Sequence, residues 1–284
     1  MKWNIITFFL ILILRLNAVG QIESHGTIVV INSSQNEIVF AADGRSAKAS
    51  SYSDDDCKIS AFGNKVVFAA SGRRGLWNRS TRSYEWDAYT LARKEFRSFT
   101  SKGTPQSVVE QFASSWGIAM KKELEIDIAA DQTHALANVE DDHVLALGAF
   151  AEFKRDKTFL IVIEKITYEI TANGKVIVKA FVDHRITNPE SYYIGKGEII
   201  RELDAAQTPR SREWRRDFDM GLGFSSDPIV FEATKLVRLT IDNYPPTRTD
   251  SKGKKFSIVG GPIAVARFTP KGVEWVEKGN CPQK

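Results

Sequence analysis

Two short apolar runs near the start of the chain predict a β-hairpin. Residues 27–31 and 37–42 are rich in β-branched and aromatic side chains, and the polar residues 32–36 between them suit a turn. Facing residues of an antiparallel pair have a constant sum of their numbers, so a turn centred near residue 34 or 35 brings Thr27 opposite residues 41–43. We therefore expect Asp43 and Arg45 to lie beside Thr27.

Strands and helices follow in separate groups along the rest of the chain. Periodicity and turn residues predict strands at 58–62, 65–70, 144–150, 159–164, 167–171, 175–182, 262–268 and 272–276, and helices at 82–99, from Thr104-Pro105 onward, at 197–206 and at 227–242. Such segregation favours an α+β class over a parallel βαβ fold. We expect two facing antiparallel sheets with a helix pair on each outer face, which together form a four-layer αββα sandwich.

The first twenty residues have the pattern of a signal peptide. A basic start precedes an apolar run at residues 5–14, which is shorter than the roughly 20 residues that span a bilayer. Ala18-Val19-Gly20 then offers small residues to a signal peptidase. We expect cleavage after Gly20, a pro-segment at 21–26, one domain at 27–284, and a secreted or periplasmic protein without a membrane span. An uncleaved anchor is the alternative.

Composition narrows the range of functions. With 43% hydrophobic residues the chain can bury a large core, and its formal net charge of +4 does not argue for a nucleic-acid partner. The arginines at 210–216 fit a solvated helix face or loop, with an anionic partner as the alternative. Cys57 and Cys281 could form one disulfide, and no spacing suggests a metal ligand set or another cofactor. Motifs of serine-triad and zinc hydrolases are absent from the sequence.

Thr27 is a candidate nucleophile if the chain is cut directly before it. A threonine hydroxyl needs a positioned base, and a free α-amine, with a pKa of about 7.7–8.0, can accept its proton near neutral pH. Only an N-terminal threonine carries both groups. Gly26, which has no side chain to obstruct attack on its carbonyl, would therefore be removed.

Three further positions supply what such a nucleophile needs. An ammonium at Lys58 would favour the unprotonated amine, and Asp43 would hold that lysine by a charge-assisted hydrogen bond. The backbone at Ser71-Gly72, at a predicted strand end, suits the stabilisation of an oxyanion.

These residues carry a resemblance to a known family. Gly26-Thr27, Ala41-Ala42-Asp43-Gly44-Arg45, Cys57-Lys58-Ile59 and Ala70-Ser71-Gly72 resemble, in order and nearly in spacing, motifs of proteasome β-type subunits and related N-terminal-nucleophile hydrolases. The resemblance is clear over residues 25–75 and faint beyond them.

The resemblance implies an exported zymogen that cleaves itself after Gly26. The mature threonine protease or amidohydrolase would act on a peptide or other amide through an acyl-enzyme. The resemblance also leaves room for a homo-oligomer. It implies Thr27 as nucleophile and base, Asp43 and Lys58 as the supporting ion pair, Arg45 as a structural brace and Gly72 as oxyanion donor. We add Ser71 as a substrate-binding residue.

The later part of the chain departs from the family pattern. Lys196 stands where the family has a serine. Phe256 and Val259 precede Gly260-Gly261 where the family has an aspartate and a serine, with Ser257 and Asp250 as stand-ins.

Simpler interpretations also stand beside the catalytic ones. Thr27 could be an ordinary strand residue, Asp43 a turn former, Lys58 a solvated strand-edge lysine and Gly72 a turn glycine. A catalytically silent scaffold or binding subunit, as among proteasome α-type chains, is therefore the alternative function.

Overall fold

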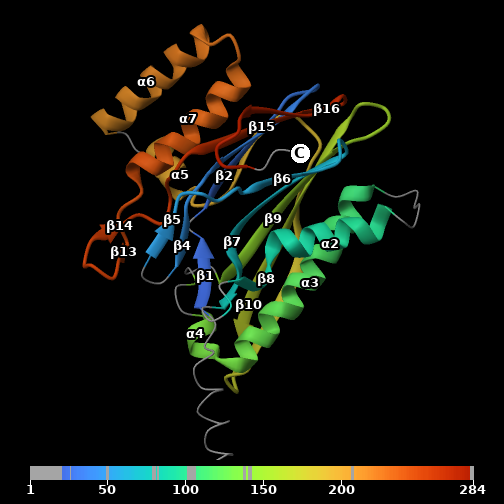
Figure 1. Ribbon diagram of the computed structural model, residues 1–284. Coiled ribbons are helices and arrows are strands. Elements are labelled where there is room, and N and C mark those ends of the chain that lie inside the picture. Colours follow the sequence, from blue (N-terminus) through green and yellow to red (C-terminus); the bar gives the residue numbers. More distant parts are fainter. Residues whose placement is uncertain are drawn as a thin grey trace, which may run out of the picture.

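The computed structural model describes residues 21–25, 27–48, 51–78, 81, 83–100, 107–136, 139, 143–205 and 208–281. Within this part of the chain, two large antiparallel sheets occupy the middle of the molecule (Figure 1). Helices α2 and α3 lie on one side of the sheets, and α5, α6 and α7 lie on the other (Figure 1). The predicted leader and Gly26 lie outside the described residues.

The larger sheet is nine-stranded in the described part of the chain. Its path runs through β11 (Val176–Ile186), β10 (Phe159–Ile170), β9 (Val144–Phe153), β7 (Val66–Asn78), β1 (Gln21–His25), β4 (Ser46–Lys48) and β5 (Ser51–Ser53). Strands β6 (Ile59–Phe62) and β8 (Ser83–Asp87) also pair with β7. Strand β7 therefore links several separate parts of this sheet.

The smaller of the two large sheets is built around the first hairpin. Its order is β12 (Ser191–Gly195), β2 (Ile28–Ser33), β3 (Ile38–Asp43), β15 (Ile263–Thr269) and β16 (Gly272–Glu277). A separate short pair consists of β13 (Arg248–Thr249) and β14 (Lys255–Phe256). Because β2 follows β1 directly, the chain passes from one sheet to the other at Thr27.

The helices form two groups in the sequence. They are α2 (Ala88–Thr100), α3 (Val108–Ala130), α4 (Gln132–Leu136), α5 (Glu198–Ala205), α6 (Pro209–Phe224) and α7 (Pro228–Asn243). The hydroxyl of Thr208 and the carboxylate of Asp227 cap α6 and α7, and each of these helices begins with a proline. Proline suits this position because the first backbone N–H of a helix has no partner within it.

Three hydrophobic cores hold these layers together. One lies between the sheets and includes Phe40, Ile161 and Phe268. A second joins the larger sheet to α2 and α3 through aromatic side chains, among them Trp116 and Phe150 with ring centroids 5.5 Å apart. The third joins the smaller sheet to α7. The predicted α+β class is confirmed, while the finer assignment to a four-layer sandwich stays a prediction.

Some predicted elements need correction. Residues 83–87 form strand β8 rather than the start of a helix, because they pair with β7 across residues 75–78. Helix α3 is capped by Ser107, and Thr104-Pro105 lies outside the described residues. The two strands predicted at 159–164 and 167–171 are one continuous strand, β10.

The first hairpin forms as predicted, but its register differs by one residue. Val29 pairs with Ala42, which sets Thr27 level with Gly44 rather than with residues 41–43. Asp43 still reaches the start of β2, because Ile28 N donates a hydrogen bond to Asp43 Oδ1 at 3.1 Å.

Among the described residues, none of the helices combines the length and the apolar character that crossing a bilayer requires.

Candidate active site

Thr27 lies at the junction of the two sheets and is buried. Only 1% of its surface is exposed, and Oγ1 has no hydrogen-bond partner among the described residues. Its carbonyl accepts a hydrogen bond from Lys196 N at 2.8 Å. Gly195 has φ +87°, and a Cβ there would collide with the same carbonyl, so only glycine permits this approach. The backbone of Thr27 is thus fixed while its hydroxyl has no partner within the described chain.

Asp43 anchors the site from the end of β3. Its carboxylate accepts hydrogen bonds from the backbone N–H groups of Ile28 at 3.1 Å, Gly260 at 3.0 Å and Arg45 at 3.4 Å. It also accepts one from Lys58 Nζ at 3.0 Å. Donors from the loop after β3 and from three other segments therefore fix this carboxylate, and the role of Gly260 could not be foreseen from local sequence.

Lys58 is buried beside Asp43 with 2% of its surface exposed. Burial lowers the pKa of its ammonium, and the Asp43 carboxylate opposes that change. Burial likewise raises the pKa of Asp43, against the effect of Lys58 and of the backbone donors. The interpretation of Lys58 as a solvated strand-edge lysine is wrong, because its side chain is enclosed and ion-paired.

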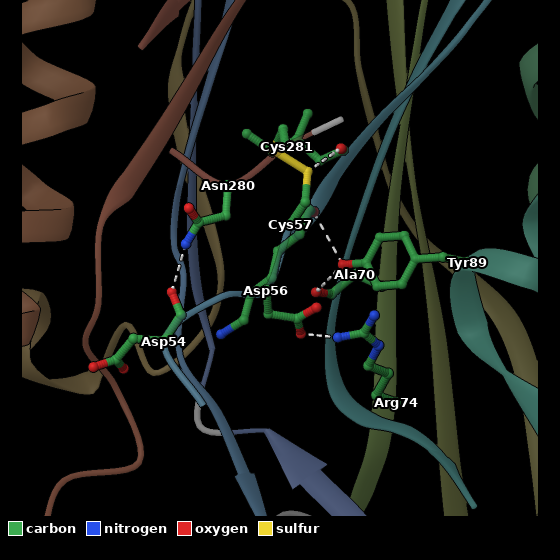
Figure 2. The surroundings of a disulfide bond; sticks show 10 residues. Asp54, Asp56, Cys57, Ala70, Arg74, Tyr89, Asn280 and Cys281 are labelled. Carbon is green, nitrogen blue, oxygen red and sulfur yellow. Dashed lines mark hydrogen bonds and ion pairs between the residues drawn. A yellow bond between two sulfur atoms is a disulfide. The ribbon is translucent and has the colours of Figure 1, made fainter. Parts of the chain in front are cut away.

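Tyr89 ties the segment that carries Lys58 to strand β7. Its hydroxyl lies 3.0 Å from the carbonyl oxygen of Lys58 and 3.3 Å from that of Ala70 (Figure 2). The phenol is buried, which raises its pKa. Neutral at ordinary pH, Tyr89 can donate to these carbonyls and hold Lys58 close to residues 70–72.

Ser71 and Gly72 line the same small cavity as Thr27 and Lys58, which we call the Thr27 cavity. Gly72 has φ +84°, and a Cβ there would lie 2.6 Å from the carbonyl oxygen of Leu145, so this position requires glycine. The interpretation of Gly72 as a turn residue is wrong, since it lies within β7. Ser71 Oγ is buried without a hydrogen-bond partner among the described residues.

Arg45 lies outside the Thr27 cavity, behind Asp43. Its guanidinium forms a two-point pair with Asp54 at 2.6 and 2.9 Å and donates to the carbonyl of Ser257 at 3.1 Å. The Tyr52 ring lies 4.3 Å beneath it. These contacts join the loop after β3 to the segment before β15.

The side chains suggested as stand-ins make hydrogen bonds within their own turns. Asp250 accepts hydrogen bonds from Lys252 N and Lys254 N within the β13–β14 turn. Ser257 Oγ contacts the backbone of Val259 two residues away. Both side chains therefore serve local turns, and the contact with Asp43 from this segment comes from the Gly260 N–H instead.

Lys196, which replaces the serine of the family pattern, is mostly buried. Its ammonium lies 5.5 Å from the centre of the Tyr244 ring and 3.9 Å from a carboxylate oxygen of Glu198. Burial lowers its pKa, with Glu198 opposing. Its backbone N–H, rather than a serine hydroxyl, meets Thr27.

An ion pair between Asp56 and Arg74 lines the Thr27 cavity and was not foreseen from the sequence (Figure 2). Next to it, Cys57 and Cys281 form a disulfide, as their number allowed (Figure 2). Asn280 Nδ2 also donates to the carbonyl of Asp54 at 2.9 Å, so the C-terminal segment is attached beside the lysine-bearing loop.

The structure brings Thr27, Asp43, Lys58, Ser71 and Gly72 together and places Arg45 behind them. Their chemical roles stay predictions. Within the described residues, no group of three or more His, Cys, Asp or Glu side chains is arranged to hold a metal ion.

Comparisons with known proteins do not assign a family. No protein-family model and no curated protein matches the sequence. Similar solved structures include an Anbu (Gly-1) mutant from Hyphomicrobium sp. strain MC1, with 14% identity and a TM-score of 0.42, covering 88% of this chain and 85% of that one. Another is Anbu (ancestral beta-subunit) from Yersinia bercovieri, with 11% identity and a TM-score of 0.42, covering 90% and 88%.

The identification from sequence motifs as an exported proteasome β-subunit-type hydrolase is therefore wrong. Motifs that agree over about fifty residues suggested it, but no family model matches, and the two Anbu structures share only 14% and 11% identity with this chain.

Proposed function

We propose that this chain is the precursor of a threonine-dependent amide hydrolase. One observation carries the proposal: the buried hydroxyl of Thr27, which has no hydrogen-bond partner among the described residues, shares a small cavity with Lys58, Ser71 and Gly72. A buried hydroxyl without a partner costs free energy, so its presence calls for an explanation. A role as nucleophile supplies one.

Maturation would release the Thr27 amine. Oγ1 attacks the carbonyl carbon of Gly26 and the C–N bond breaks, so that the amide becomes an ester and the nitrogen becomes the amine of Thr27. Water then hydrolyses the ester, which frees the acid of residue 26 and restores the hydroxyl. Lys58, which lines the same cavity and whose pKa is lowered by burial, would exchange a proton during these steps.

Turnover would use the new amine as base. The amine takes the hydroxyl proton while Oγ1 attacks the substrate carbonyl, and the Lys58 charge keeps the amine unprotonated at neutral pH. The Gly72 N–H would stabilise the oxyanion. The amine then protonates the leaving nitrogen, and water hydrolyses the acyl-enzyme to return Thr27 to its starting state.

The position of β1 supports an extended peptide as substrate. This strand pairs with β7, where His25 faces Gly72, and with β4, where Ser24 faces Ala47. Removal of residues 21–26 would leave backbone hydrogen-bonding groups of β7 and β4 unpaired on either side of the vacated position. A peptide that pairs with both edges as an added strand would bring a carbonyl to Gly72.

Export forms part of the proposal. The leader pattern at residues 1–20 suggests it. The disulfide supports it, because disulfides form and persist mainly in oxidising compartments.

Intact-mass measurement of the purified protein tests the nucleophile. We expect the wild-type chain to begin at Thr27, and Thr27→Ala to keep residues 21–26 and to hydrolyse no peptide amide. Thr234→Ala is the matched control, because Thr234 also has a buried hydroxyl without a hydrogen-bond partner among the described residues. It lies on α7 and should mature normally.

The same measurement addresses the silent-scaffold alternative. A wild-type chain that begins at Gln21 and stays intact on incubation would favour a binding protein over a hydrolase. A Thr27→Ala variant that still turned over substrate would remove Thr27 from the mechanism.

A further inference from the structure

The Thr27 cavity is too small for most side chains. Its volume is about 10 Å³, roughly the space that one water molecule requires. Asp56 and Arg74 line it together with Thr27, Lys58 and Tyr89. Besides Lys58, the charged side chains of Asp56, Arg73 and Arg74 thus border the small space beside Thr27.

A much larger groove lies on the other side of this ion pair. The outer groove has a volume of about 510 Å³ and is lined by Cys57, Phe62, Arg93 and Trp275 among others. It shares Asp56, Arg74 and Tyr89 with the Thr27 cavity. These three residues, which we call the partition, therefore separate the small cavity from the large one.

The partition is held in place from several directions. The Arg74 guanidinium lies 5.1 Å from the Tyr89 ring centre and 5.3 Å from that of Tyr84, which are distances of cation–π contact. Asp56 N donates to the carbonyl of Gly44 at 3.0 Å. The disulfide at Cys57 fixes the neighbouring backbone (Figure 2). The partition is therefore held in place by β7, by α2 and by the loop before β6.

We propose that the Asp56–Arg74 ion pair determines substrate specificity by closing the Thr27 cavity. The inference rests on the proposed function. With the partition closed, the enzyme accepts amides whose attacked carbonyl belongs to glycine or another residue with a very small side chain. The chain's own residue before Thr27 is glycine, which is consistent with this restriction.

Removing both charges should open the cavity into the outer groove. We would compare wild type with the double variant Asp56→Ala/Arg74→Ala on fluorogenic peptide amides that differ only in the attacked residue, glycine or leucine. For wild type we expect kcat/KM for glycine to exceed that for leucine by about 100-fold, a scale typical of exclusion by pocket size. In the double variant the ratio should fall to within about tenfold, because leucine gains.

The single variants give a sharper test. Asp56→Ala leaves the Arg74 cation, which should favour a glutamate as the attacked residue. Arg74→Ala leaves the Asp56 carboxylate, which should favour a lysine. Loss of structure alone would not shift charge preference in opposite directions. Arg185→Ala is the matched control, because it breaks the ion pair with Glu110 away from the cavity and should leave all preferences unchanged.

If the alanine variants fail to fold, as judged by circular dichroism, Asp56→Asn/Arg74→Met replaces them with uncharged side chains of similar volume. This variant should keep the preference for glycine and show no preference between glutamate and lysine. Wild type that hydrolyses leucine amides as fast as glycine amides would overturn the inference while leaving the nucleophile intact. So would single variants without opposite charge preferences. Absence of any Thr27-dependent cleavage, including that of the chain's own bond, would overturn the proposed function and this inference with it.

Discussion

At the scale of single residues, the site is organised around one buried ion pair. Asp43 and Lys58 lie 3.0 Å apart, and each is almost fully enclosed. Breaking a buried pair by removing one partner leaves an unpaired charge in a poorly solvated environment, which is far more costly than removing both partners. Mutations of this pair should therefore affect the stability of the protein and the chemistry of the site to different extents.

Replacing Lys58 by methionine should destabilise the protein more than replacing the whole pair. We expect Lys58→Met to lower the free energy of unfolding by about 3–5 kcal/mol, because Asp43 loses its partner. Lys58→Met/Asp43→Asn should recover much of this loss in urea titrations. Neither variant should mature. Equal destabilisation by the single and double variants would show that the unpaired Asp43 carboxylate costs no more than a neutral asparagine.

A second buried carboxyl group should set a pH dependence of stability. Burial raises the pKa of Glu164 to about 7, and Arg185 only partly offsets this. The folded chain therefore keeps a proton that the unfolded chain loses above the ordinary value of 4.5. This stabilising contribution is complete below that ordinary value and is lost as pH rises through about 7.

Glu164→Gln should remove this dependence. The wild-type free energy of unfolding should fall by roughly 3 kcal/mol more than that of the variant between about pH 4.5 and pH 8. The glutamine also avoids a buried carboxylate close to Gly117, so the variant should melt at a higher temperature at the upper pH. Parallel pH profiles for the two proteins would contradict this assignment.

At the scale of elements, sequence patterns predicted the hairpins whose paired strands lie close together in the sequence. The first hairpin and the turn at Gly63-Asn64 were predicted because strand and turn signals lie within a dozen residues of each other. The one-residue register error arose because the turn length alone was used to fix the pairing. Strands β1, β8 and β12 were missed, because each is defined by pairing with a strand far away or already assigned to another partner.

The residues of the candidate site also differ in whether the sequence could place them. Thr27, Asp43 and Lys58 could be placed from hairpin geometry and from the chemistry of an N-terminal threonine. The partition could not, because Asp56 and Arg74 meet only after β6 and β7 have folded together. Gly260 and Lys196 act through backbone N–H groups, and the side-chain types that sequence analysis weighs give no sign of such contacts.

At the scale of the whole molecule, one disulfide joins the site to the end of the chain. Cys57 and Cys281 are 224 residues apart in sequence, so their bond closes nearly the entire domain into a loop. Cys281 is buried in the core between the sheets. Self-association, which the sequence left open, stays a prediction.

Loss of the disulfide should lower stability substantially. For so long a loop, chain entropy predicts up to about 5 kcal/mol, and native-state relaxation can reduce that value. We expect Cys57→Ser/Cys281→Ser to melt below wild type in thermal denaturation, and a reducing agent to lower the wild-type melting temperature towards that of the variant. An unchanged melting temperature in both cases would show that the bond does not restrain the unfolded chain.

The central position of β1 means that maturation would also loosen part of the larger sheet. In the described part of that sheet, β4 and β5 connect to the other strands through β1. Excision of residues 21–26 would remove the strand partner of that hairpin, which would then be held by its covalent ends and by packing of Ala47 and Tyr52 against the rest of the domain. Amide hydrogens of residues 46–48 and 51–53 should then exchange faster in the mature protein than in Thr27→Ala, and a bound peptide should slow them again.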